Sequence, residues 1–168
     1  MAVKPYIVSR EFAAPRELVW NVNTQAEHLE KWLGPEGVTG FTKSMDFRVG
    51  GKYHYAQRTA DGSFNAWGIM TYLEISPMDR IVSIQSFSDE NGDITMHPLA
   101  PTWPKLMHWV MDFEDLGNSR TKLSVTWLPV DGSSAEELAL FDGAREGMNG
   151  GWKGTFDKLE NYLITLKS

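Results

Sequence analysis

The amino-acid sequence predicts an α+β fold in which a curved antiparallel sheet of seven strands wraps a long C-terminal helix around an apolar pocket. Three observations carry this prediction. Alternation of apolar and polar residues opens the chain and returns over residues 38–130, where turn residues interrupt it as in an antiparallel meander. Two short helical patterns follow the first strand, and residues 134–166 carry an apolar stripe at helical spacing. A chain of 168 residues holds one sizeable core, so we expect a single domain over residues 1–168.

The N-terminal segment predicts one strand and two short helices. Alternation over residues 5–12 is typical of a strand. Pro15 suits the first turn of the first helix, because its missing N–H is not needed there. The second helix is expected to begin at Thr24, whose hydroxyl and the carboxylate of Glu27 would form a capping box, and to end before Pro35.

Six further strands fit between recurring turn signals. The clearest pair covers residues 106–113 and 120–127, where one face of each strand is apolar and the other polar. This pattern indicates a sheet that is covered on one side only. The turn signals lie at residues 50–51, 61–62, 77–79, 90–93 and 117–118.

A proline-rich loop interrupts the strands over residues 97–104. Its three prolines prevent regular strand pairing and favour an extended, stiff segment. Because the loop carries Trp103, it is either a lid over the pocket or a segment that Trp103 anchors on the core.

The C-terminal helix is expected to begin at Ser133 or Ser134, with Glu136 or Glu137 completing a capping box. Each glycine inside a helix costs about 1 kcal/mol relative to alanine. The glycines therefore form either a smooth groove that admits a ring or a ligand, or a break near Asn149 and Gly150. The groove would consist of Gly143, Gly147, Gly151 and Gly154, with Gly150 beside it.

Arg145 occupies a position in the apolar stripe of this helix. If it faces the pocket, its guanidinium would anchor a ligand carboxylate or phosphate. The alternative is that its stem reaches the helix edge and the guanidinium pairs with Asp142 or Glu146.

Composition and missing motifs exclude several classes of function. The formal charge of −6 and the pI near 5.2 are unfavourable for nucleic acid or an anionic membrane. The chain has no cysteine, no signal-length apolar start and no membrane-length apolar run, so we expect a cytoplasmic protein without membrane insertion. Nucleotide-binding motifs are absent and the four histidines are scattered, so neither a cofactor nor a metal is expected.

Bulky aromatic and methionine side chains are abundant, and such side chains either fill a core or line a pocket. No catalytic constellation accompanies them. If catalysis occurs, its actors would be Arg145, Tyr53, Tyr55 or His54. The predicted ligand-binding residues are Trp20, Trp32, Tyr53, Tyr55, Trp67, Trp103, Met107, Trp109, Met111, Trp127, Phe141, Arg145, Met148 and Trp152.

Short segments spread over nearly the whole chain share their order and spacing with a known family. They are residues 10–20, 32–35, 49–51, 77–81 and 151–152, followed by Leu159. In these segments the chain resembles the START-like, or SRPBCC, superfamily, and in particular its activator of heat-shock-protein-90 ATPase homologue family. The resemblance implies a helix-grip fold with a cavity between sheet and C-terminal helix. It also implies a functionally mixed family of hydrophobic-ligand carriers, polyketide cyclases and aromatase-like enzymes.

These observations favour a protein that binds an apolar or aromatic small molecule in the cavity. Two alternatives stay open: a cyclase-type or aromatase-type enzyme, and a co-chaperone-like or stress-related interaction domain. The sequence also leaves a homodimer open.

Overall fold

The computed structural model describes residues 3–167 as a curled sheet of seven strands with four helices. The strands are β1 (Tyr6–Phe12), β2 (Val38–Met45), β3 (Lys52–Thr59), β4 (Asn65–Ser76), β5 (Arg80–Ser88), β6 (Met107–Gly117) and β7 (Arg120–Pro129). The helices are α1 (Arg16–Thr24), α2 (Ala26–Trp32), α3 (Ala135–Gly143) and α4 (Arg145–Lys167). The predicted α+β class, strand number and order of elements are confirmed.

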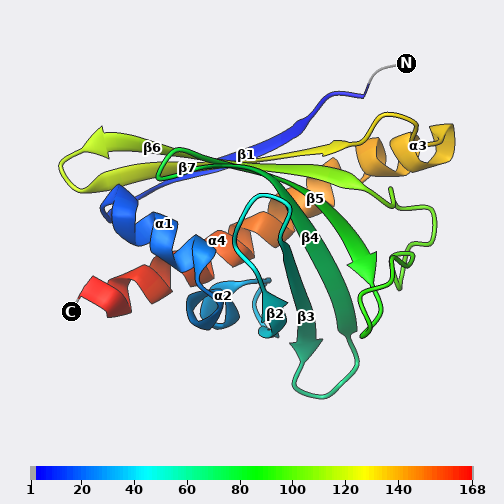
Figure 1. Cartoon of the computed structure of the whole chain (residues 1–168), viewed down its shortest axis with the longest axis horizontal. Helices are drawn as coiled ribbons and strands as arrows, with labels where there is room; N and C mark the ends of the chain where they lie inside the picture. The colour runs from blue at the N-terminus through cyan, green and yellow to red at the C-terminus, as the bar shows by residue number, and fades with distance from the viewer. Residues whose placement is uncertain (1–2, 168) are drawn as a thin grey trace.

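All neighbouring strands pair antiparallel, in the order β1-β7-β6-β5-β4-β3-β2. The sheet bends, and α4 runs diagonally across its inner face while α1 and α2 lie beside it (Figure 1). Alternate strand residues therefore point toward the helix, and in β6 these are Met107, Trp109, Met111 and Phe113, all buried. Their alternation in the sequence predicted this inner face correctly.

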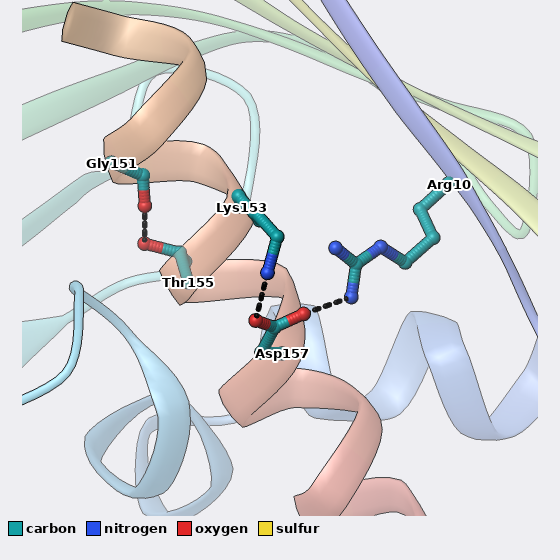
Figure 2. A network of polar contacts seen from close by, with 5 residues as sticks. All are labelled: Arg10, Gly151, Lys153, Thr155 and Asp157. Atoms are coloured by element: carbon teal, nitrogen blue, oxygen red, sulfur yellow. Dashed lines mark hydrogen bonds and ion pairs between the residues drawn. The ribbon is translucent and has the colours of Figure 1, made fainter.

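Side chains of α4 are bonded to both edge strands of the sheet. On one edge Asp157 accepts a hydrogen bond from Arg10 of β1 at 2.8 Å and one from Lys153 of its own helix at 3.0 Å (Figure 2). On the other edge Lys158 Nζ donates to the carbonyl of Val38 in β2 at 2.8 Å. The helix thus links β1 and β2, the two edge strands of the curled sheet.

The predicted capping box at the start of the second helix is wrong. Thr24 is the last residue of α1, and its hydroxyl donates to the carbonyl of Trp20 at 2.9 Å, so it is not available to cap a following helix. Helix α2 begins at Ala26 without a side-chain cap. Pro15 lies one position before the first turn, as the N-cap of α1.

The C-terminal helical region is broken, but not at the predicted place. The capping box of Ser134 and Glu137 is present at the start of α3. The Ala144 N–H bonds to the carbonyl of Phe141, three residues back, so the α-helical pattern ends at Gly143 and α4 begins at Arg145. Asn149 and Gly150 lie inside α4, so the alternative of a break near them is wrong.

Within residues 3–167, no helix is long and apolar enough to cross a membrane.

Candidate ligand-binding cavity

A cavity of about 540 Å³ lies between the inner face of the sheet and the N-terminal half of α4. Its wall comes from strands β3 to β7, from α3 and α4, and from three connections that carry Pro35, Phe64 and Trp103. Ligand pockets begin at roughly 300 Å³, so the space suffices for a small organic molecule. Two of its lining residues, Gly143 and Gly147, are exposed.

Glycines of the C-terminal helices form the wall opposite the sheet. A Cβ atom added to Gly143, Gly147 or Gly151 would meet no heavy atom within 4 Å, and all three residues line the cavity. The predicted glycine groove is therefore present. Its fourth member, Gly154, lies outside the cavity, where an added Cβ would approach Pro35 at 3.8 Å.

Three tryptophans interlock along one side of the cavity. Trp109 of β6 and Trp127 of β7 are direct cross-strand partners with ring centroids 5.2 Å apart. Trp152 of α4 packs on both, at 5.6 and 5.5 Å. The indole N–H groups of Trp109 and Trp127 are buried, with no hydrogen-bond partner among the described residues. We call Trp109, Trp127 and Trp152 the indole wall.

The structure brings eight of the fourteen predicted ligand-binding residues to the cavity: Tyr55, Trp67, Trp103, Met107, Trp109, Trp127, Met148 and Trp152. Whether they bind a ligand stays a prediction. Trp67 borders the cavity, but its ring packs against Phe41 and His54, on the outer side of the sheet. This placement follows from strand alternation, because its neighbours Ala66 and Gly68 point inward.

Five other predicted residues are core residues outside the cavity. Trp32, Tyr53 and Met111 surround a separate void of about 30 Å³. Trp20 packs on Phe113 with ring centroids 5.1 Å apart. Phe141 is fully buried, with its ring 5.9 Å from that of Trp103. Sequence pattern marked these side chains as buried but could not separate core from pocket wall.

Arg145 does not line the cavity, so its predicted role as an anchor for a ligand carboxylate is wrong. Its guanidinium pairs with Asp142 at 2.8 Å and donates to the carbonyls of Pro5 and Lys4. It also lies over the ring of Phe141. The alternative that Arg145 pairs with Asp142 is confirmed.

Four neutral polar side chains that the sequence analysis did not single out line the cavity: Gln57, Gln85, His97 and Thr155. Gln57 shares the inner face of β3 with Tyr55, and Gln85 follows Ile81 and Ser83 on the inner face of β5. Strand alternation in residues 52–59 and 80–88 was the signal that could have found both glutamines.

His97 is held in its neutral form. Its Nδ1 accepts a hydrogen bond from the backbone N–H of Leu99 at 3.0 Å, which places the ring proton on Nε2. Partial burial against Phe87 and Trp103 lowers the pKa of His97 below its ordinary value. Among residues 3–167, no Asp, Glu, Lys or Arg side chain lines the cavity, so the described wall is uncharged at neutral pH.

His54, a candidate for catalysis, lies on the outer side of the sheet. Its Nε2 is 3.0 Å from the carbonyl oxygen of Asp89, and its ring packs on that of Trp67. Within residues 3–167, no group of three or more His, Asp or Glu side chains could hold a metal ion.

The curled seven-stranded antiparallel sheet, closed by a C-terminal helix over an apolar cavity, defines a helix-grip protein of the START-like, or SRPBCC, type. Residues 13–164 match the family described as activator of Hsp90 ATPase homolog 1-like protein, and the chain belongs to that family. The resemblance that the sequence motifs suggested is therefore confirmed. No curated protein matches the chain significantly.

Solved structures share this fold at low sequence identity. A protein from Arthrobacter aurescens superposes with a TM-score of 0.77 at 24% identity, covering 96% of this chain and 86% of its own. Protein CV1439 from Chromobacterium violaceum gives 0.73 at 22% identity, covering 95% and 96%. The AHSA1 protein from Silicibacter pomeroyi gives 0.71 at 16% identity, covering 98% and 100%. At these identities the likeness concerns the fold alone.

Proposed function

We propose that the protein binds an uncharged, apolar or aromatic small molecule in this cavity. The observation that carries the proposal is a space of about 540 Å³ whose wall combines the indole wall with Met107 and Met148 and includes no charged side chain. Flat aromatic ligands stack on indole rings, and methionine side chains adapt to irregular shapes. A charged ligand would lose its hydration without gaining an ionic partner.

The enzyme alternative finds less support. A cyclase or aromatase would need at least two titratable side chains converging on the ligand. The titratable side chains that line the cavity are those of His97 and Tyr55; burial lowers the pKa of His97 and raises the pKa of Tyr55 to about 12, and Arg145 and His54 lie elsewhere. A chaperone partner, a homodimer and a cytoplasmic location stay predictions.

The experiment is a titration with phenylnaphthylamine, a neutral aromatic probe whose emission rises in apolar surroundings. Wild type should bind it saturably, and Gly151→Leu should weaken binding at least tenfold, because the added side chain enters the cavity. Gly150→Leu is the matched control: it is the adjacent helix position, an added Cβ there also meets no atom within 4 Å, and it does not line the cavity.

Circular dichroism checks that both variants are folded. If Gly151→Leu and Gly150→Leu then weaken probe binding equally, the probe binds outside the cavity. Absence of saturable binding to wild type would contradict the proposal as well.

A further inference from the structure

Three neutral polar side chains of the cavity, those of Tyr55, Gln57 and Gln85, lie on β3 and β5 beside the indole wall. Gln85 Nε2 donates to the hydroxyl oxygen of Tyr55 at 3.3 Å. Gln57 lies two residues from Tyr55 on the same strand face, and the His97 ring packs 4.5 Å from that of Phe87, two residues from Gln85. The cavity therefore has a neutral polar side next to the indole wall, in which the N–H groups of Trp109 and Trp127 are unpaired among the described residues.

Tyr55 is held in place by the glycine opposite it. Gly68 is its cross-strand partner, and a Cβ added to Gly68 would lie 2.6 Å from the Tyr55 hydroxyl oxygen and from the ring carbon that bears it. The phenol thus lies flat across β4 and reaches Gln85 on the next strand. Only a residue without a side chain at position 68 permits this arrangement.

The Tyr55 hydroxyl is a donor without an acceptor. Burial raises the pKa of Tyr55 to about 12, so the hydroxyl keeps its proton at neutral pH. Its oxygen already accepts from Gln85, and no other partner for it is found in the described part of the chain. A buried donor left unpaired is unfavourable, and a ligand oxygen within reach would pair it.

We infer that the ligand of this cavity is an uncharged aromatic ketone, whose rings lie on the indole wall and whose carbonyl oxygen accepts a hydrogen bond from Tyr55. The inference rests on the proposed function and adds the chemical class of the ligand. Gln85 acts as a positioning residue, because its N–H occupies the hydroxyl oxygen and leaves the Tyr55 proton for the ligand. A carboxylate is excluded by the same wall, which offers it no cation.

The test compares three tricyclic ligands of similar size, fluorene, fluorenone and fluorene carboxylate, by competition against phenylnaphthylamine. Wild type should bind fluorenone about three- to tenfold more tightly than fluorene, as expected for one net hydrogen bond. The carboxylate should bind most weakly of the three.

Tyr55→Phe should abolish the preference for fluorenone over fluorene. Gln85→Met should reduce the preference, because the hydroxyl is then free to rotate. Thr155→Val is the matched control, since it removes another hydroxyl from the cavity wall, one already bonded to the carbonyl of Gly151 at 3.0 Å (Figure 2). This control should keep the full preference.

The possible failures are distinct. If fluorene displaces the probe but wild type does not prefer fluorenone, the ketone inference is wrong and the proposed function stands. A preference that persists in Tyr55→Phe also overturns the inference. If none of the three ligands displaces the probe, the proposed function itself has failed.

Discussion

The two halves of α4 face the same sheet but differ in what they bury. The N-terminal half presents Gly147 and Gly151 to the cavity, with no atom within 4 Å of an added Cβ. The C-terminal half presents Phe156, Leu159 and Leu163, which are almost completely buried. Both halves are helical, so secondary structure does not account for the difference.

The contrast separates stability from binding along one helix. In the C-terminal half, large side chains meet Phe12 of β1 and the other core residues at close-packed distances, and Tyr162 bonds to His28 of α2 at 2.6 Å. In the N-terminal half, glycines give up helix propensity and leave space. Substitutions in the two halves should therefore have different consequences, taken below from the largest effect to the smallest.

The largest effect is expected from Phe156→Ala in the close-packed half. Phe156 packs on Phe12 at 5.7 Å and on Trp152 at 5.2 Å, so its removal should lower the free energy of unfolding by about 3–5 kcal/mol. Met148→Ala at the cavity wall should cost only about 2 kcal/mol, because that side chain lacks neighbours on one side. Urea denaturation measures both, and equal losses would remove the distinction between the halves.

The next largest effect concerns Gly68, the cavity residue whose space is already occupied. Gly68→Ala should reduce the free energy of unfolding by about 1–3 kcal/mol, because the new methyl group meets the buried Tyr55 ring. In the background of Tyr55→Ala, where the ring is absent, Gly68→Ala should cost less than it does in wild type. A neutral effect of the single substitution would show that Tyr55 moves aside freely.

A smaller effect of opposite sign is expected at Gly147. Gly147→Ala adds a methyl group that has no neighbouring atom within 4 Å and improves helix propensity. The free energy of unfolding should therefore rise by up to about 1 kcal/mol. Phenylnaphthylamine binding should change little, since a methyl group fills a small part of the cavity. Destabilisation would mean that the glycine serves the helix in some way other than leaving space.

The smallest effect is expected at the ion pair that joins α4 to β1. The hydrogen bond from Arg10, followed by that from Lys153, lowers the pKa of Asp157 below its ordinary value of 3.8. The native state therefore favours the charged form, and the stabilisation is present above pH 3.8 and is lost as the pH falls through the lowered pKa. Because the pair is only partly buried, Asp157→Asn should lower the melting temperature only slightly at neutral pH.

The difference in melting temperature between wild type and Asp157→Asn should shrink with added salt and below pH 3.8. A difference that is constant across this pH range would show that the asparagine acts by another route.

Local patterns were sufficient for much of the fold. Alternation placed the inner faces of β6 and β7, turn residues separated the strands, and the Ser134 capping box marked the start of α3. The Thr24 capping box failed because a threonine at a helix end can bond back to its own helix instead, and spacing alone cannot distinguish the two.

By itself, the sequence determined that tryptophans, methionines and glycines would meet between the sheet and the C-terminal helix, since the apolar faces of both elements must be buried against each other. Tertiary structure alone decided which of them line the cavity, where the helix breaks, that Arg145 turns away, and that Gln57, Gln85 and His97 supply the polar side. The physical reason is that a pocket wall and a core have the same local pattern. They differ only in whether another part of the chain fills the space opposite.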